Sequence, residues 1–469
     1  MIALRASEIA TIVGGTLHGD DIEVVAPPVI DSRSATAGSL FIAFKGEHVD
    51  GHDFVSDALS RGAVLTLAER AVDMPYVHVS DCVSALGALA HEIRKRLTSL
   101  TVIGITGSQG KTTTKELLAS VLSNHAPTVA PKGNFNNQIG APLSLLECSE
   151  TTRYCIVEMG ARHPGDIAHL CRIAEPNIGV VLRVGTAHIG EFGSQEAIAK
   201  TKSELISSLK PSATAILGTY DEFTPAMSAL HQGKVMTFGE KQGCDVRATD
   251  VEIREGRAHF DLVTPEGRTS IGLRIIGLHQ VANALAVAAV ASALGLTLDQ
   301  IASGLATAES HAKWRMEISE LDSLVLINDA YNASPEAMSA ALQTLVHFAQ
   351  ERGGESWAFL GKMHELGESS PQDHATIGTL ASDLSIDHLV CVGAPEYASA
   401  IPSGSQTTVH QCIDKFTAAE LVNAMNEGDV VLVKASRSEK LEELAQLITE
   451  KWQARTEGAA NRNNGGKTS

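Results

Sequence analysis

The stretch VIGITGSQGKTTTK, residues Val102–Lys115, is the most informative part of this chain because it has the form of a phosphate-binding loop. An apolar strand leads into a turn bounded by Gly107 and Gly110, and Lys111 and Thr112 then open a helix. In such a loop the backbone N–H groups point inward and the helix N-terminus adds partial positive charge. The lysine reaches the outer phosphates, and the threonine hydroxyl can bind Mg²⁺. The sequence therefore predicts a nucleoside triphosphate site.

The loop has the short GxxGK[ST] form, because Ile105 stands where the longer pattern has a glycine. The alternative is a glycine turn that only joins a strand to a helix, and the Lys–Thr order argues against it. We expect the whole loop to contact the nucleotide, through Gly107, Ser108, Gln109, Gly110, Lys111, Thr112 and Thr113.

Length and charge restrict the class of protein. A chain of 469 residues predicts about three domains. The formal net charge of −18 argues against a surface that coats nucleic acid. Seven cysteines without a CxxC pair favour free thiols in a reducing cytoplasm. The longest run of small apolar residues, Val281–Leu296, is too short to span a bilayer, so we expect a buried helix there.

The order of apolar runs predicts an α/β protein with three domains. Residues 1–98 combine short strands with a closing helix, and residues 99–310 alternate apolar strands with helices, as in a parallel sheet covered on both faces. Residues 311–453 restart the strand–helix alternation. We expect the polar, glycine-rich tail of residues 454–469 to be disordered.

Two polar side chains follow apolar strands of the central segment. Glu158 ends the strand in YCIVEMG, and His188 follows the strand and turn in VVLRVGTAH. Ligands of open α/β sheets bind at the carboxyl ends of the strands, which favours a metal-binding role for both side chains. The alternatives are a surface carboxylate and an ordinary core or surface histidine. Lys202 lies in a helical stretch, where composition alone indicates a solvated lysine.

Further polar clusters occur in the central segment. GNFNNQIGAP, residues 133–142, is rich in amides suited to bind phosphate or a peptide backbone, and it includes Asn136 and Asn137. His279 and Asn283 lie four residues apart on one face of a helix. The alternative for that pair is a helix start with one buried amide.

The third segment repeats the pattern of polar residues after strands. Asp329 and Asn332 follow a strand in INDAYNASP, where an acidic side chain often binds ribose hydroxyls, although turn chemistry would also explain these residues. Arg315 stands alone between the second and third segments. LVKASRSEK ends a strand with an expected anion clamp of Lys434, Ser436 and Arg437.

Together these motifs resemble the Mur ligase family over nearly the whole chain. DSR (31–33), FKGEHVDGHDF, TGSQGKTTTK, NFNNQIGAPLSLL, VEMGARHPGDI, GTAHIGEFGS, GLHQVANALA, NDAYNASP, MHELGE and KASR occur in family order. NDAYNASP and MHELGE favour the member that adds D-alanyl-D-alanine. The DNPR motif that selects a diamino acid in the preceding ligase of the pathway is absent from the sequence.

The resemblance implies roles for individual residues. It reverses the interpretation of Lys202, since related ligases carry a carbamate formed with CO₂ on the lysine at this place. Thr112, Glu158, His188 and the carbamylated Lys202 would hold two Mg²⁺ ions, and Lys111, Lys202, His188 and Glu158 form the expected catalytic set. The expected contacts to ATP are His279, Asn283, Arg315 and Asp329. The expected contacts to the uridine nucleotide and peptide are Ser32, Arg33, Asn136, Asn137, Asn332, Lys434, Ser436 and Arg437.

The resemblance also implies a reaction. The γ-phosphoryl group of ATP would pass to the carboxylate of a UDP-MurNAc-tripeptide, and D-alanyl-D-alanine would attack the acyl phosphate. Since water destroys an acyl phosphate, we expect the third domain to close over the second, with hinges near residues 98–100 and 308–314. We expect a cytoplasmic monomer without nucleic-acid partners or stable membrane insertion.

Several residues depart from the family pattern, and other functions stay open. Arg183 stands where asparagine is common and could pair with Glu158 or a phosphate, Lys362 takes a place that is more often acidic, and Ala435 replaces a glycine. The alternatives are a folylpolyglutamate-synthase-like ligase and a catalytically inactive ATP-binding relative. A P-loop motor is disfavoured, because the loop is short.

Overall fold

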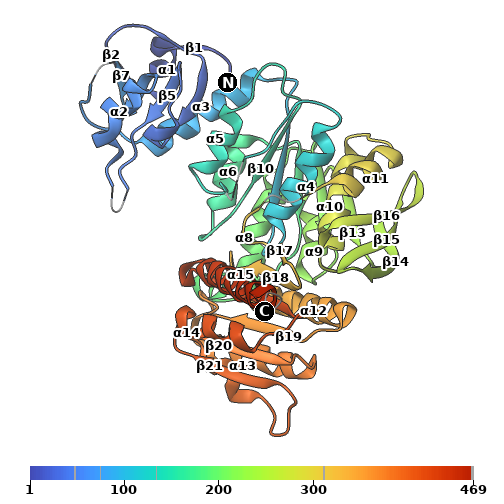
Figure 1. Cartoon of the computed structure of the whole chain (residues 1–469). Helices are drawn as coiled ribbons and strands as arrows, with labels where there is room; N and C mark the ends of the chain where they lie inside the picture. The colour runs from blue at the N-terminus through green and yellow to red at the C-terminus, as the bar shows by residue number, and fades with distance from the viewer. Residues whose placement is uncertain (47–48, 74, 132, 134, 310–311, 466–469) are drawn as a thin grey trace.

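Each of the three segments forms its own sheet in the computed structural model of the chain, which describes residues 1–46, 49–73, 75–131, 133, 135–309 and 312–465. Figure 1 shows the central domain between the blue N-terminal domain and the orange to red C-terminal domain. The predicted α/β fold with three domains is confirmed.

The N-terminal domain is a small sheet with helices against it. Its five strands run in the order β2-β7-β6-β5-β4. A short antiparallel pair, β1 with β3, lies beside them. Helix α3 closes the domain, and Asp81 caps its first turn by accepting hydrogen bonds from Val83 N and Ser84 N. The bounds are β1 (Leu4–Arg5), α1 (Ala6–Val13), β2 (Thr16–His18), β3 (Glu23–Val24), β4 (Ala26–Val29), β5 (Ser39–Ile42), α2 (Val55–Ser60), β6 (Ala63–Ala68), β7 (Tyr76–His78) and α3 (Cys82–Arg96).

The central domain carries the phosphate-binding loop between β8 and α4. Strands β8 to β14 of its sheet pair in parallel, in the order β14-β13-β12-β11-β8-β10-β9. The predicted helix over residues 281–296 is α10, which is buried along most of its length. The bounds are β8 (Thr101–Thr106), α4 (Lys111–Ser123), β9 (Thr128–Val129), α5 (Gly140–Leu146), β10 (Tyr154–Glu158), α6 (Asp166–Ala174), β11 (Ile178–Val181), α7 (Ile189–Phe192), α8 (Gln195–Ser207), β12 (Thr214–Gly218), α9 (Phe223–Ala226), β13 (Lys234–Gly239), α10 (Gln280–Ala293) and α11 (Leu298–Thr307).

The central sheet has an antiparallel extension that the sequence analysis did not predict. Strands β14 (Val246–Arg254), β15 (Arg257–Thr264) and β16 (Gly267–Ile276) form a meander at one edge. Buried and more exposed side chains alternate along β15, as in a strand with only one covered face. Because these strands are antiparallel, tight turns join them and no connecting helix is required.

The C-terminal domain is a second α/β unit. Its sheet has the order β17-β18-β22-β19-β20-β21, with only β17 antiparallel to its neighbour. Ser334 caps α12 through its hydroxyl, and Pro335 occupies the first turn. The bounds are β17 (Glu317–Leu321), β18 (Leu324–Asp329), α12 (Pro335–Arg352), β19 (Ser356–Leu360), α13 (Ser370–Asp383), β20 (His388–Val392), β21 (Thr408–Cys412), α14 (Lys415–Ala419), β22 (Val430–Lys434) and α15 (Glu442–Gly465).

The C-terminal end differs from the predicted disordered tail. Helix α15 extends to Gly465, past the expected start of the tail at residue 454. A helix that has already nucleated propagates at little cost through a stretch without proline. Among the described residues, none of the helices is both long enough and apolar enough to span a bilayer.

Candidate active site

The phosphate-binding loop joins the end of β8 to the start of α4, as predicted. Gly110 has a left-handed backbone with a φ of 81°, which favours glycine. An added Cβ there would lie 2.3 Å from Asn283 Oδ1, so the loop also approaches α10 too closely for any larger residue. Lys111 Nζ donates to Gly107 O at 2.7 Å, which folds the lysine back over the loop. The loop therefore has the geometry of a phosphate cradle.

The strand-end carboxylate lies next to this loop. Thr112 Oγ1 donates to Glu158 Oε2 at 3.0 Å, and Asn136 Nδ2 donates to Glu158 Oε1 at 2.9 Å. Glu158 is 1% exposed. Lys115 Nζ, at 3.9 Å, is its ion-pair partner. The structure thus brings together a hydroxyl and a carboxylate, the hard oxygen ligands that Mg²⁺ prefers.

Lys202 is a buried cation on α8, 7% exposed, and not the solvated lysine that composition indicates. Burial lowers its pKa well below the ordinary value, and the charge of nearby Lys111 lowers it further. Within the described part of the chain, no carboxylate forms an ion pair with Lys202. The neighbouring Glu204 instead caps α6, because its oxygens accept hydrogen bonds from Gly165 N and Ala168 N.

His188 lines the same cavity as the phosphate-binding loop. Its backbone is left-handed with a φ of 66°, an uncommon conformation for a residue with a side chain. Its Nδ1 contacts Glu365 Oε2 of the C-terminal domain. Burial lowers the pKa of His188, the charge of Glu365 opposes that shift, and the charges of Lys111 and Lys202 add to it. His188 therefore lies within the electrostatic reach of both lysines.

The described residues contain no set of three His, Cys, Asp or Glu side chains arranged to hold a metal ion. Thr112 and Glu158 offer two oxygen ligands, and His188 lies near them without completing a site. A metal ion bound here would need ligands from the nucleotide, from water or from a modified Lys202. Mg²⁺ sites commonly combine one or two carboxylates with substrate phosphates and water.

The start of α10 and the end of β18 form the next part of the site. Asn283 is buried, donates to Gln280 Oε1 at 2.7 Å and accepts from Thr114 Oγ1 at 3.2 Å. Burial lowers the pKa of His279 to about 4, and the charge of Asp329 opposes this shift. Lys434 Nζ donates to Asp329 Oδ2 at 2.5 Å and to Asn332 O at 2.9 Å. The C-terminal domain thus places these charged groups opposite α10.

These groups surround a cavity of 190 Å³ between the central and C-terminal domains. Cavities of 580 and 730 Å³ adjoin it through shared lining residues. Most of the predicted catalytic and nucleotide-binding residues line the small cavity, together with Asn332 and Lys434. They are Ser108, Gln109, Gly110, Lys111, Thr112, Thr113, Glu158, His188, His279, Asn283, Arg315 and Asp329.

Two predicted arginines stack on aromatic rings at the rim. The Arg315 guanidinium lies 3.9 Å from the centre of the Tyr331 ring, and the Arg437 guanidinium lies 4.3 Å from that of Trp314. Arg437 also donates to Glu442 Oε1 at 2.5 Å. The predicted clamp is therefore already engaged with protein groups.

The remaining predicted residues lie outside the small cavity or have structural contacts. The Asn137 side chain accepts hydrogen bonds from Ile139 N and Gly140 N, so its oxygen caps α5. The Ser436 hydroxyl accepts from His364 N at 2.9 Å. Ser32 and Arg33 belong to the N-terminal domain. Ser32 is buried, whereas the Arg33 side chain is 80% exposed and paired with Asp31.

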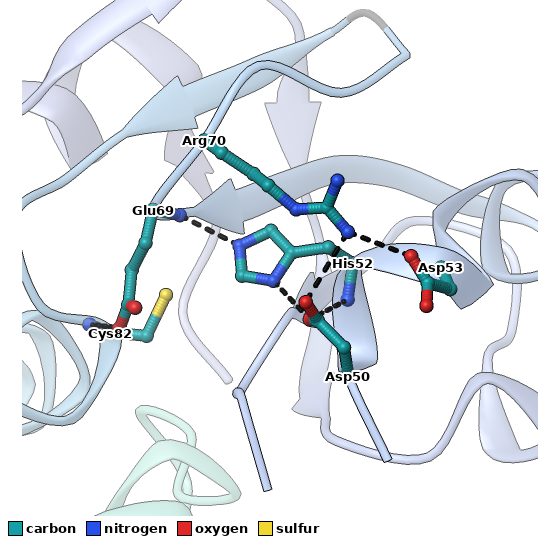
Figure 2. A network of polar contacts seen from close by, with 6 residues as sticks. All are labelled: Asp50, His52, Asp53, Glu69, Arg70 and Cys82. Carbon is teal, nitrogen blue, oxygen red and sulfur yellow. Dashed lines mark hydrogen bonds and ion pairs between the residues drawn. The ribbon is translucent and has the colours of Figure 1, made fainter.

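A polar network in the N-terminal domain fixes the turn that contains the FKGEHVDGHDF motif (Figure 2). Buried His52 accepts a hydrogen bond from Glu69 N at Nε2, so its Nδ1 carries the proton that is donated to Asp50 at 2.6 Å. Arg70 then pairs with Asp50 and Asp53. The network holds residues 50–53 against the end of β6.

Two carboxylates of the C-terminal domain that were not expected from the sequence, Glu336 and Glu365, contact residues of the central domain that line this cavity. Glu336 accepts hydrogen bonds from Thr186 and Gln109, and Glu365 contacts His188. Glu336 follows the Ser-Pro start of α12, and Glu365 belongs to MHELGE, but neither position indicates a distant partner.

The departure at Arg183 is also explained in part. Arg183 lines the cavity beside the loop, and the described residues include neither a hydrogen-bond partner for its Nε nor an ion pair with Glu158. Its charge acts on Tyr220 instead, where burial raises the phenol pKa and Arg183 opposes that shift. Of the two suggested partners of Arg183, Glu158 does not pair with it among the described residues, and the pairing with a phosphate stays a prediction.

Family models match three consecutive parts of the chain. Residues 29–100 match the Mur ligase family catalytic domain, residues 105–291 match the Mur ligase middle domain, and residues 314–437 match the Mur ligase glutamate ligase domain.

Individual relatives match over nearly the full length. The UDP-N-acetylmuramoyl-tripeptide–D-alanyl-D-alanine ligase of Mycobacterium tuberculosis is 38% identical over 96% of this chain and 98% of its own. The crystal structure of MurF from Acinetobacter baumannii has a TM-score of 0.87 at 34% identity, covering 96% of this chain and 99% of that one. The MurF ligase of Thermotoga maritima in complex with ADP has a TM-score of 0.78 at 32% identity, covering 92% and 98%.

A folylpolyglutamate synthase from Mycobacterium tuberculosis is a more distant neighbour. It has a TM-score of 0.60 at 17% identity, covering 79% of this chain and 93% of its own. That likeness shows a shared fold alone.

Proposed function

Because the chain belongs to the Mur ligase family, we propose that it adds D-alanyl-D-alanine to a UDP-MurNAc-tripeptide in peptidoglycan precursor synthesis. It is an ATP-dependent ligase that forms a C–N bond. The observation that carries the proposal is the 38% identity to a ligase of this specificity over 96% of the chain. The complete phosphate cradle at the domain boundary supports it.

The site suits phosphoryl transfer from ATP to a carboxylate. Both reactants are anions that repel each other, so the site must supply positive charge near the transferred group. Lys111 is directed over the loop by its bond to Gly107 O, and the N-terminus of α4 adds partial positive charge. We assign to Lys111 the stabilisation of the γ-phosphoryl group as it moves to the peptide carboxylate.

We further propose that Lys202 carries a carbamate. Burial and the charge of Lys111 favour its neutral amine, the form that adds to CO₂ and then loses a proton. The product is an anion, which the positive charge of nearby Lys111 would stabilise. A carbamate would also supply further oxygen ligands near Glu158, the carboxylate that accepts from Thr112 of the phosphate loop.

Thr112, Glu158, His188 and carbamylated Lys202 are the residues that we propose to hold Mg²⁺. The hydroxyl and carboxylate that meet at 3.0 Å fit the ion, and the two further ligands lie around the same loop. An Mg²⁺ ion held by these residues would supply positive charge beside the phosphates. Glu158 is also held by Asn136, so its orientation does not depend on the metal ion alone.

The remaining assignments follow from the positions of the domains. Ser32 and Arg33 would bind the uridine nucleotide, and Asn332 would bind the peptide end at the cavity rim. We assign Asp329 to the ribose and Asn283 to the adenine side. The acyl phosphate is attacked by the dipeptide amine, and the C-terminal domain over the cavity excludes water from that step.

The experiment measures phosphate release from ATP with UDP-MurNAc-tripeptide, with and without D-alanyl-D-alanine, and identifies the product by mass spectrometry. Turnover that requires both substrates is expected. Lys202→Ala should lower kcat at least 100-fold, and added acetate should restore part of it by replacing the lost carboxylate.

Other outcomes would contradict these assignments. Turnover with a folate and glutamate, but not with the tripeptide, would establish the folylpolyglutamate-synthase-like alternative. Binding of ATP without turnover under any of these conditions would indicate an inactive relative. Full activity of Lys202→Ala would remove the carbamate while leaving the ligase intact.

The domain boundaries 1–98, 99–310 and 311–453, the cytoplasmic location and the monomeric state stay predictions. Residues 310–311 of the second expected hinge lie outside the described residues.

A further inference from the structure

We infer that Glu336 and Glu365 of the C-terminal domain are positioning residues, which make the arrangement of Gln109 and His188 depend on closure of that domain. The inference rests on the proposed function, because it assigns these carboxylates a part in the same ligase reaction. It starts from the segment of residues 185–190, here called the relay turn, which lies beside the phosphate loop and carries His188.

The relay turn is attached directly to the phosphate loop. Ser108 N donates to Arg183 O at 2.9 Å, and Gly185 N donates to Ser108 Oγ at 2.8 Å. Both ends of this link belong to the central domain. A movement of the relay turn is therefore transmitted to the loop that cradles phosphate.

Glu336 joins the relay turn and the phosphate loop from the other domain. Its Oε1 accepts hydrogen bonds from Thr186 N and Thr186 Oγ1, each at 2.9 Å, and its Oε2 accepts from Gln109 Nε2 at 3.2 Å. Ser334 Oγ, buried at the start of α12, accepts from the same Gln109 amide at 3.0 Å. One carboxylate thus uses both oxygens to hold two central-domain segments.

Glu365 holds the other end of the relay turn. Its side chain contacts His188 Nδ1, and its backbone carbonyl accepts from Gly190 N at 2.9 Å. The left-handed backbone of His188 requires support of this kind from its surroundings. Glu365 therefore contacts the ring of His188 through its side chain and holds the turn through its backbone.

The fit between the relay turn and the C-terminal domain is close at two glycines. A Cβ on Gly185 would lie 3.0 Å from Glu336 Oε1. A Cβ on Gly190 would lie 2.7 Å from Gly367 N and 2.8 Å from Glu365 O. Separation of the C-terminal domain from the relay turn would break these contacts and the hydrogen bonds beside them.

The test compares Glu336→Ala and Glu365→Ala with Glu351→Ala. Glu351 is a matched control, because it lies on α12 like Glu336 and also accepts a hydrogen bond from the central domain, from Glu255 N at 3.0 Å. That contact is to the β14–β15 turn and touches neither the phosphate loop nor the relay turn. All three variants lose one carboxylate of the C-terminal domain.

Glu336→Ala should lower kcat about 10–100-fold, since small displacements of positioning groups cost up to that much. KM for the UDP-MurNAc-tripeptide should change less than about 2-fold, because its nucleotide binds in the N-terminal domain. Glu336→Asp, which keeps the charge but reaches less far, should recover part of kcat. Glu365→Ala should lower kcat in the same way, and Glu351→Ala should leave both parameters within about 2-fold of the wild type.

Hydrogen exchange gives a readout that does not depend on turnover. In the ligand-free protein, the amide of Thr186 should exchange at least about 10-fold faster in Glu336→Ala than in the wild type, and should be unchanged in Glu351→Ala. Unchanged kcat and unchanged exchange in Glu336→Ala would overturn the inference. Equal decreases of kcat in Glu336→Ala and Glu351→Ala would also overturn it. They would mean that any lost contact between the two domains lowers the rate.

The two proposals fail in different ways. If the wild type shows no dipeptide-dependent turnover, the proposed function fails while the exchange measurement still decides whether Glu336 holds the relay turn. If the wild type is active and the exchange of Thr186 is unaffected, only the role of Glu336 fails.

Discussion

The central domain shares one hydrophobic core with the N-terminal domain, whereas it meets the C-terminal domain through hydrogen bonds of side chains and backbone and through an ion pair. One cluster of buried apolar residues includes Leu86 and Leu89 of α3 together with Leu145 of α5 and Ile173 of α6. Within the described residues, the apolar clusters of the C-terminal sheet include no residue of the central domain. The same domain therefore has one apolar and one polar interface.

The two interfaces also differ in how closely backbone and side chains meet. At the apolar interface, Gly87 of α3 faces Ile173, and Arg94 donates to Ala174 O, Glu175 O and the Asn177 side chain. Separating these surfaces would expose apolar area and leave carbonyl groups unpaired. The polar contacts of Glu336 and Glu365 can instead be exchanged for water at small net cost. We expect closure and opening at the second interface only.

The largest effect is expected from breaking the apolar interface with Arg94→Ala. The substitution leaves carbonyl groups at the end of α6 without their charged donor and should lower the free energy of unfolding by about 2–4 kcal/mol. Arg96→Ala is the matched control on the same helix, because Arg96 pairs with the partly exposed Glu8 and Glu92 and should cost less than about 1 kcal/mol. Urea denaturation measures both variants.

The N-terminal and central domains should also unfold together in Arg94→Ala, as one transition at lower urea. Two separate unfolding transitions in the wild type would show that the shared core does not join the domains. Equal decreases in the free energy of unfolding for Arg94→Ala and Arg96→Ala would show the same.

The second largest effect is expected from adding one methyl group at the polar interface, with the same change at the apolar interface as its control. Gly190→Ala places a Cβ against Gly367 N and Glu365 O, where backbone cannot yield, so full closure is blocked. We expect kcat to fall about 10–100-fold while the free energy of unfolding changes by less than about 0.5 kcal/mol, because opening the domain relieves the clash.

Gly87→Ala is the matched substitution at the apolar interface. Its Cβ would lie 3.1 Å from the end of the Ile173 side chain, which can rotate away, and alanine is favoured over glycine inside a helix. Activity and stability should therefore stay close to those of the wild type. Loss of stability in Gly190→Ala as large as its loss of rate would mean that the polar interface is rigid.

The fold could be predicted from the sequence wherever a local pattern decides it. The predicted helix over residues 281–296, which is α10, rests on a single run of small apolar residues. The β14–β16 meander was missed because we extended the strand–helix alternation through it, although its period-two pattern is visible in β15. Local periodicity therefore has to be examined element by element.

The site was predictable only in part, because its parts lie far apart in the sequence. The phosphate loop is one contiguous motif, and Glu158 follows the rule for strand ends. Thr186 and Glu336 are 150 positions apart, and no spacing rule joins them. Asn137 was predicted to bind substrate, but its side chain accepts a hydrogen bond from Gly140 N at the start of α5. An amide in a polar cluster can bind the neighbouring backbone instead of a ligand.

The smallest expected effect is a pH dependence of the polar interface. His279 starts α10 opposite Asp329 and Lys434 of the C-terminal domain, and burial lowers its pKa from 6.5 to about 4 in the closed structure. In an open structure the hydrated ring would return to its ordinary pKa and bind a proton more readily. Closed protein should therefore lose stability relative to open protein as the pH falls from about 6.5 towards 4.

Between pH 7 and 5.5 this loss amounts to about 1 kcal/mol for a single group. Distance measurements between spin labels on α4 and α13 should show a larger open population at pH 5.5 in the wild type. His279→Asn cannot titrate in this range, so its open population should depend less on pH. An identical pH dependence in both proteins would mean that His279 keeps its environment on opening, and the polar interface would then not be the one that separates.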